Sequence, residues 1–248
     1  GPTTPPLAPE PPNEDARRMP PPPAVTIAPG VRRLTAPNPG PFTADGTNSY
    51  ILGTGRVAII DPGPDDARHV AALLAATAGE TITDIFLTHT HRDHSGALPA
   101  LAAASGARTL SGGPYRPARP LLPGETAAHG EANDTGHVPD VLLADGDLVS
   151  GEGWRIAVVA TPGHAANHLA FALPAADLVF SGDHVMGWSS SIVAPPDGSM
   201  SAYMASLDRL AARPTASPAR PASSSASPRA TERSRRSSPR SMPGSTRR

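Results

Sequence analysis

Cysteine is absent from the 248 residues. Its absence excludes disulfide bonds and thiolate ligands, so a metal site in this chain must use imidazole and carboxylate groups. No apolar run approaches the roughly 18 residues of a membrane span. No basic segment followed by an apolar one marks a secretory signal near the N-terminus. We therefore expect a cytoplasmic protein without a membrane partner.

Lysine is also absent, and aromatic residues are scarce. All 21 basic residues are arginine, and aromatic residues make up only 4% of the chain. The accompanying bias towards Ala, Gly, Pro and Arg is typical of a G+C-rich gene. With so few rings available, a core must be built mainly from Ala, Val, Leu and Ile.

The two ends of the chain differ in composition from the middle. Much of the proline, 32 residues in all, lies at the ends. The formal net charge is −1, but nine arginines and one acid fall between Ala211 and Arg248, so an acidic body carries a basic tail. We predict a disordered Pro-rich leader at 1–24, a folded domain at 25–212 and a disordered Arg/Ser/Pro-rich tail at 213–248.

Hydrophobic patterns between the two ends predict alternating strands and helices. The predicted strands are 31–34, 48–52, 57–60, 82–87, 109–110, 154–160, 169–173 and 178–181. The predicted helices are 65–78, 96–104 and 201–212, with loops at 88–95 and 115–136. Strands interleaved with helices favour a layered α/β sandwich with helices on the outside.

The strongest chemical motif is His89-Thr-His91-Arg-Asp93-His94. It follows the apolar segment Ile85-Phe-Leu87, so it gathers three imidazoles and a carboxylate at the end of a strand. Alternate residues of an extended chain point to the same side, which places His89 and His91 together. Imidazole and carboxylate are ligands that suit Zn²⁺ and similar divalent ions. The motif therefore predicts a metal site.

Two later segments have the same form. Val158-Val-Ala-Thr-Pro-Gly-His164 is a strand, a sharp turn and an imidazole, and Leu178-Val-Phe-Ser-Gly-Asp183 is a strand, a glycine and a carboxylate. Each would present one ligand at a strand end. Either segment alone is a weak signal, but together with the first motif they predict one shared cleft.

These segments resemble those of metallo-β-lactamase-fold hydrolases, among which bacterial relatives of β-lactamase-like endoribonucleases and glyoxalase II-type thioesterases are the most similar. The similarity covers roughly residues 25–212. The matching segments, in chain order, are Gly46-Thr-Asn-Ser-Tyr50, Ile60-Asp-Pro-Gly63, His89-Thr-His91-Arg-Asp93-His94, Thr161-Pro-Gly-His164 and Ser181-Gly-Asp183. The resemblance implies a four-layer αββα sandwich with a binuclear metal site between its two sheets.

The resemblance also implies roles for individual residues. The implied ligands are His89, His91 and His164 for one metal, Asp93 and His94 for the other, and Asp183 bridging both. Zinc is the expected metal, with Mn²⁺ or Fe²⁺ as alternatives, and a metal-bound hydroxide is the expected nucleophile. Asp93 is also expected to accept or pass on a proton. Asp61, His168 and His184 are expected to lie beside the ligands and orient them without binding the metal themselves.

The C-terminal part of the family pattern is missing. The family places one more histidine after the bridging aspartate, but no histidine follows His184 in this sequence. We therefore expect an incomplete second metal site and impaired activity. Translation in a shifted reading frame would explain the tail, and a natural basic tail is the alternative.

Three functions remain open at this point. The first is a hydrolase of a small ester, a thioester or an RNA phosphodiester. The second is a metal-binding member of the same superfamily that is catalytically impaired by the missing ligand. The third is a nucleic-acid-binding protein that uses its Arg-rich tail. The remaining histidines, His69, His129 and His137, are expected to be exposed or structural.

Overall fold

The computed structural model describes residues 23–125 and 132–213. The predicted disorder of the leader and the tail thus falls outside the described residues, apart from positions 23, 24 and 213. No helix in the described ranges combines the length and the apolar character that crossing a membrane requires.

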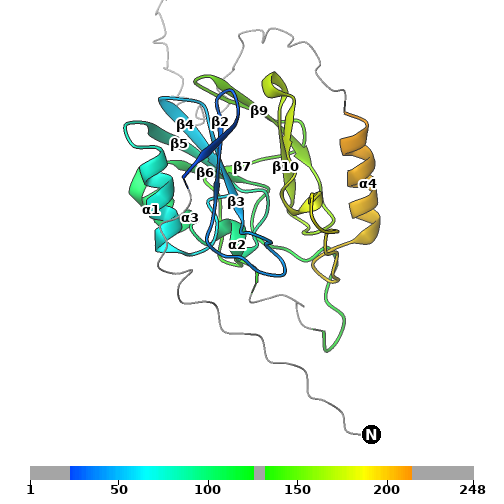
Figure 1. Ribbon diagram of the computed structural model, residues 1–248. Coiled ribbons are helices and arrows are strands. Elements are labelled where there is room, and N and C mark those ends of the chain that lie inside the picture. The colour runs from blue at the N-terminus through cyan, green and yellow to red at the C-terminus, as the bar shows by residue number, and fades with distance from the viewer. Residues whose placement is uncertain (1–22, 126–131, 214–248) are drawn as a thin grey trace, which may run out of the picture. The chain divides into compact units, whose positions relative to one another are not determined.

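A seven-stranded mixed sheet forms the first half of the fold (Figure 1). In order across the sheet, its strands are β1 (Val25–Ala28), β2 (Val31–Thr35), β3 (Asn48–Leu52), β4 (Arg56–Ile60), β5 (Thr81–Phe86), β6 (Arg108–Ser111) and β7 (Val141–Leu142). Neighbours from β1 to β4 pair antiparallel, whereas neighbours from β4 to β7 pair parallel. Parallel neighbours need crossover connections, and those from β4 to β5 and from β5 to β6 contain helices.

A four-stranded antiparallel sheet forms the second half. Its strands, in order across the sheet, are β11 (Leu178–Phe180), β10 (Leu169–Leu173), β9 (Trp154–Ala160) and β8 (Leu148–Gly151). Because β9 and β11 both pair antiparallel with β10, they run in the same direction. The segments that follow these two strands therefore emerge at one edge of the sheet.

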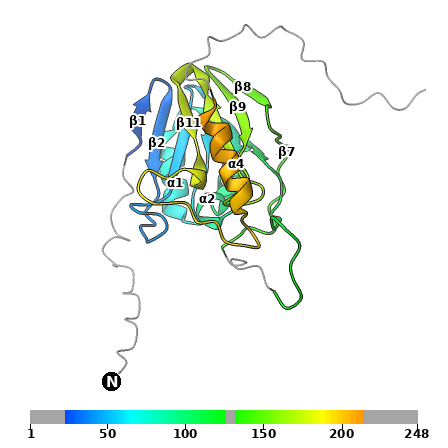
Figure 2. The same ribbon diagram turned by 90° about the vertical axis from the view of Figure 1, so that its right-hand side faces the viewer.

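Helices cover the outer faces of both sheets (Figures 1 and 2). Helices α1 (Ala67–Ala76) and α3 (Leu98–Ser105) lie against the seven-stranded sheet, and α4 (Met200–Ala211) lies outside the four-stranded sheet. The short elements are α2 (Arg92–Ser95) and the 3-10 turns η1 (Pro174–Ala176) and η2 (Gly182–His184). The described chain is therefore the αββα sandwich that the sequence analysis predicted.

Two apolar clusters hold these layers together. One joins the facing sides of the two sheets, and Phe86 stands at its centre with its ring edge-on to Trp154 and Phe171. The other lies between the seven-stranded sheet and helices α1 and α3 and consists of Leu, Ile, Val and Ala. Each fully buried large apolar side chain contributes roughly 1.5–3 kcal/mol relative to an exposed one. The aromatic rings of the core thus lie between the two sheets, and aliphatic side chains fill the rest of the core.

Several local predictions were wrong. The segment 88–95, predicted as a loop, contains helix α2, whose first turn begins directly after His91. Strands β1, β7 and β8 were not predicted, because they are short and their residues are largely exposed. Helix α1 begins after Asp66, whose side chain accepts a hydrogen bond from the backbone N–H of Arg68 and so caps the helix.

Candidate metal centre

Three segments that follow strands β5, β9 and β11 meet at one end of the sandwich. The structure brings together side chains that the sequence predicted as ligands, namely His89, His91, Asp93, His94, His164 and Asp183. The ligand-type atoms of His89, His91, His164 and Asp183 all lie within 4.8 Å of one another, and the same holds for Asp93, His94 and Asp183. Asp183 belongs to both groups, as expected for a bridging carboxylate.

The hydrogen bonds around His89 fix which of its nitrogens carries the proton. The hydroxyl of Thr88 lies 2.8 Å from Oδ2 of Asp61. Because a carboxylate oxygen only accepts hydrogen bonds, the hydroxyl donates its single hydrogen to Asp61. The same hydroxyl lies 3.0 Å from Nδ1 of His89, so it must accept a hydrogen bond from that nitrogen. Nε2 of a neutral His89 then carries a lone pair that points into the cluster.

His164 is fixed in the same way. Its Nδ1 lies 2.6 Å from the carbonyl oxygen of Ile192, which can only accept, so Nδ1 is the protonated nitrogen. The lone pair of Nε2 faces Nδ1 of His91 at 2.9 Å, and Nε2 of His89 faces the same atom at 3.0 Å. One proton on His91 cannot satisfy both lone pairs. A shared cation would satisfy all three nitrogens, so this donor set fits a divalent metal.

His94 forms the other half of the centre. Its Nδ1 lies 2.9 Å from Oδ2 of Asp61, whereas its Nε2 lies 3.1 Å from Oδ1 of Asp183 and 3.5 Å from Oδ2 of Asp93. Two carboxylates and one imidazole thus converge on one point, while Asp61 holds the ring from behind. This arrangement also fits a divalent cation.

The pKa values of His89 and His94 are shifted in opposite directions by their surroundings. Burial and the neighbouring imidazoles of His94, His91 and His164 hold the pKa of His89 well below its ordinary value. Burial also lowers the pKa of His94, but the carboxylates of Asp183, Asp93 and Asp61 outweigh burial and hold that pKa well above its ordinary value. Although burial alone would raise it, the pKa of Asp183 is lowered, chiefly by His94. Neutral His89 is ready to bind a cation, whereas His94 must first lose a proton.

The predicted supporting residues lie behind the cluster, but in different ways. Asp61 contacts the backbone N–H of Thr88 at 2.8 Å as well as His94. His168 stacks on His89, with ring centroids 5.0 Å apart, and its Nδ1 lies 2.8 Å from Oγ1 of Thr161. His184 packs against Tyr203 and belongs to neither ligand group, and within the described ranges neither of its ring nitrogens has a hydrogen-bond partner.

The remaining histidines are buried where the structure describes them. Nε2 of His69 lies 2.8 Å from Oγ of Ser49, and Nε2 of His137 lies 2.9 Å from Oγ of Ser111. These contacts agree with the structural role that was predicted for both residues, although neither is exposed. His129 lies outside the described residues.

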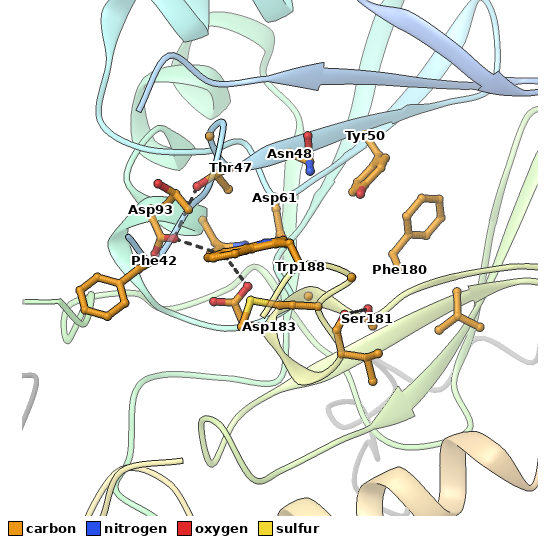
Figure 3. A pocket seen from close by; sticks show the side chains of 18 residues that line it. Phe42, Thr47, Asn48, Tyr50, Asp61, Asp93, Phe180, Ser181, Asp183 and Trp188 are labelled. Atoms are coloured by element: carbon orange, nitrogen blue, oxygen red, sulfur yellow. Dashed lines mark hydrogen bonds and ion pairs between the residues drawn. The ribbon is translucent and has the colours of Figure 1, made fainter. Parts of the chain in front are cut away.

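A cavity of about 190 Å³ opens beside the second ligand group (Figure 3). Asp93, His94 and Asp183 are among the residues that line it. Its other walls come from the loop between β2 and β3 and from the chain that follows β11, and they include Phe42 and Trp188. A substrate bound in this cavity would therefore lie directly beside the candidate metal centre.

Comparison with known proteins agrees with this fold. The family model described as the Metallo-beta-lactamase superfamily matches residues 42–216. The chain belongs to this superfamily.

Curated relatives are similar over most of this chain. The lactamase-like protein adaB of Aspergillus niger is 35% identical over 184 residues, which are 73% of this chain and 51% of that protein. The atrochrysone carboxyl ACP thioesterase of Aspergillus fumigatus is 34% identical over 199 residues, which are 79% of this chain and 56% of that protein. The chain thus spans about half the length of the curated relatives it matches.

Solved structures share the fold. The metallo-beta-lactamase family protein TTHA1429 from Thermus thermophilus matches with a TM-score of 0.60 and 26% identity, covering 75% of this chain and 71% of that chain. TTHA1623, solved in a di-iron-bound form, matches with a TM-score of 0.55 and 32% identity, covering 73% of this chain and 86% of that chain.

Some residues of the site were not identified from the sequence. Thr88 directly precedes the first ligand, so its role in orienting His89 could have been inferred from the motif. Phe42, Trp188 and the carbonyl of Ile192 belong to irregular segments with no recognisable spacing. Only the folded chain places them beside the cluster.

Proposed function

We propose that this protein is a metal-dependent hydrolase of carboxylic ester bonds, and of thioesters in particular. The proposal depends on one observation. The unprotonated Nε2 atoms of His89 and His164 both face Nδ1 of His91, and hydrogen bonds hold both rings in place. One proton on His91 can pair with the lone pair of only one of these two atoms, whereas a cation would bind both. A curated relative supports the choice of thioesters, since it is named an atrochrysone carboxyl ACP thioesterase.

We assign the first metal to His89, His91, His164 and Asp183, and a second metal to Asp93, His94 and Asp183. Bound metal would supply a water of lowered pKa, from 15.7 towards about 7, and would polarise the scissile carbonyl. Zinc fits four nitrogen and oxygen donors best, with Mn²⁺ or Fe²⁺ as alternatives. The second group has three donors among the described residues, so we expect its ion to be held more weakly.

The side chains have separate tasks in this proposal. Hydrolysis adds water to the carbonyl carbon, breaks the carbon–sulfur bond and releases an acid and a thiol. Asp93, whose Oδ2 lies 3.5 Å from Nε2 of His94 and 3.4 Å from Oγ1 of Thr47, accepts the proton that the attacking water loses. Asp61 and Thr88 hold the rings of His94 and His89 in place.

RNA hydrolysis is a weaker candidate than thioester hydrolysis. Phosphodiester substrates are bound largely by Arg and Lys contacts to phosphates. Among the eighteen described residues that line the cavity, none is Arg or Lys. This composition favours an uncharged substrate.

Turnover assays on the full chain test the proposal. S-acyl-N-acetylcysteamine thioesters, the matching oxygen esters and a dinucleotide should be compared after loading with zinc, and again after chelation. We expect metal-dependent thiol release, strongly reduced in His91→Ala and retained in His137→Gln. Metal binding without turnover of any substrate would favour the impaired metal-binding protein. Salt-sensitive nucleic-acid binding that is lost on removal of 213–248 would favour the third function.

A further inference from the structure

Large apolar side chains are exposed around the cavity beside the candidate metal centre. Phe42 is 68% exposed, Trp188 51%, Val185 49% and Val179 47%, and all four line this cavity. Single exposed apolar residues are ordinary on protein surfaces, but a group that surrounds a cavity marks a binding site. Here the group adjoins the side chains to which we assign the chemistry.

Phe42 and Trp188 approach the cavity from different halves of the fold. Phe42 lies on the loop between β2 and β3 of the seven-stranded sheet, and Trp188 lies on the chain that follows β11 of the four-stranded sheet. Figure 3 shows both side chains in the same lining as Asp93 and Asp183. A group bound in this cavity can therefore be contacted by an aromatic ring from each half.

The charges of the residues that line the cavity indicate which kind of substrate group can bind there. The carboxylate and imidazole side chains of the lining are those of the metal centre and its support, Asp61, Asp93, His94 and Asp183. The rest of the described lining is neutral and consists of aromatic, aliphatic, hydroxyl, amide and glycine residues. An anionic group on this part of the substrate would find no Arg or Lys in that lining to pair with. An apolar, uncharged group would be desolvated at little cost.

We propose that Phe42 and Trp188 are specificity-determining residues that bind an apolar, uncharged acyl group while its thioester carbonyl lies at the metal centre. This inference rests on the proposed thioesterase function and names the part of the substrate that the enzyme selects. The cavity volume of about 190 Å³ is below the roughly 300–1,000 Å³ typical of pockets for drug-sized ligands. It therefore encloses the acyl group, and the thiol carrier remains outside.

Binding can be measured without turnover. The chain has two tryptophans, of which Trp154 is buried in the core and Trp188 is half exposed at the cavity, so a blue shift on ligand binding reports on Trp188. We expect octanamide, a neutral probe, to shift the emission of the zinc-loaded full chain, and to shift that of Phe42→Ala only at higher concentration. In Trp188→Phe the shift should disappear, leaving the emission of Trp154. Absence of any shift in the unaltered protein at saturating probe would overturn the proposal.

Kinetics test specificity separately. With S-octanoyl- and S-acetyl-N-acetylcysteamine, we expect kcat/KM to favour the octanoyl substrate at least tenfold. Phe42→Ala and Trp188→Ala should each reduce that preference about fivefold or more, through a higher KM for the octanoyl substrate. Trp188→Phe should keep most of the preference, and Leu148→Ala, at an exposed residue of β8 outside the cavity lining, should keep all of it.

The two experiments separate failure of this inference from failure of the proposed function. Octanamide binding at Trp188 without thioester turnover would reject the thioesterase and keep the apolar site. Turnover with equal preference for both acyl groups, or a preference that survives both alanine variants with unchanged thermal stability, would reject the specificity role and keep the thioesterase.

Discussion

Asp61 accepts a hydrogen bond from Nδ1 of His94 at 2.9 Å, and the opposite nitrogen of that ring faces Asp183 at 3.1 Å. The same carboxylate lies 2.8 Å from both the backbone nitrogen and the hydroxyl of Thr88. Asp61 directly follows β4 and adopts a positive φ of 51°, which turns its side chain towards the segment after β5. One carboxylate thus orients both His94 and, through Thr88, His89.

Replacement of Asp61 should therefore weaken metal binding without removing a ligand. Asn also tolerates positive φ, so Asp61→Asn keeps the backbone but loses the charge that supports two rings. We expect zinc affinity to fall about 10–100-fold, as is typical when a partner behind a metal ligand is lost. Competition with a chromogenic chelator measures the affinity. Asp208→Asn, at an exposed position of α4, is the matched control and should bind zinc as the unaltered protein does.

The two ligand groups should hold metal with different strength. The first offers three imidazoles and a carboxylate, and the second offers one imidazole and two carboxylates, one of them shared. We expect close to one zinc per chain after extensive dialysis and a second only when free zinc is supplied. Elemental analysis checks this ratio. Two ions retained after dialysis would mean that a further group completes the second site.

Gly163 should be irreplaceable in the turn that presents His164. Its φ is 154°, and a Cβ there would lie 2.4 Å from Cα of Tyr203 on α4. Gly163→Ala combines backbone strain of about 1–3 kcal/mol with a clash between the new methyl group and the backbone of α4. We expect a lower Tm together with loss of tightly bound zinc, because His164 must move.

Gly153 provides the comparison for this substitution. Its φ is 75°, but a Cβ there meets nothing within 4 Å. Gly153→Ala should cost about 1–2 kcal/mol of stability and leave zinc binding unchanged. Equal zinc binding by the two variants, measured by the same chelator competition, would refute the packing argument.

His69 should make the protein sensitive to acid. Burial lowers its pKa from 6.5 to about 4, so at pH 4–6.5 the proton binds more strongly to the unfolded chain than to the folded one. Stability contributed by neutral His69 is therefore present above pH 6.5 and is lost as the pH falls towards 4. The loss amounts to about 3 kcal/mol at about 1.4 kcal/mol per pKa unit.

Urea unfolding of the metal-free protein between pH 7 and 4 measures this effect. His69→Gln should be less stable than the unaltered protein at pH 7, because it disturbs the contact with Ser49, but its stability should fall less on acidification. Parallel pH profiles for the two proteins would contradict the assignment. The acidic and imidazole groups of the metal centre are common to both proteins and cancel in the comparison.

The sequence alone determined the parts of this protein that depend on local pattern. The run from His89 to His94 places its donors a few residues apart after a buried strand, so local geometry alone brings them together. Proline and glycine mark the turn before His164, glycine marks the turn before Asp183, and apolar runs mark most central strands. The αββα fold followed from that order of elements and from the resemblance of these motifs.

Tertiary structure decided everything that depends on contacts between distant segments. His91 and His164 are separated by 73 positions, and their facing nitrogens lie 2.9 Å apart only because β5 and β9 belong to packed sheets. The protonated nitrogen of His164 is set by the carbonyl of Ile192, an interaction with no sequence signature. Phe42 and Trp188 likewise share a cavity because two sheets carry their loops to the same edge. The sequence determines which side chains are present. The direction of a lone pair and the lining of a cavity depend on how the folded chain packs.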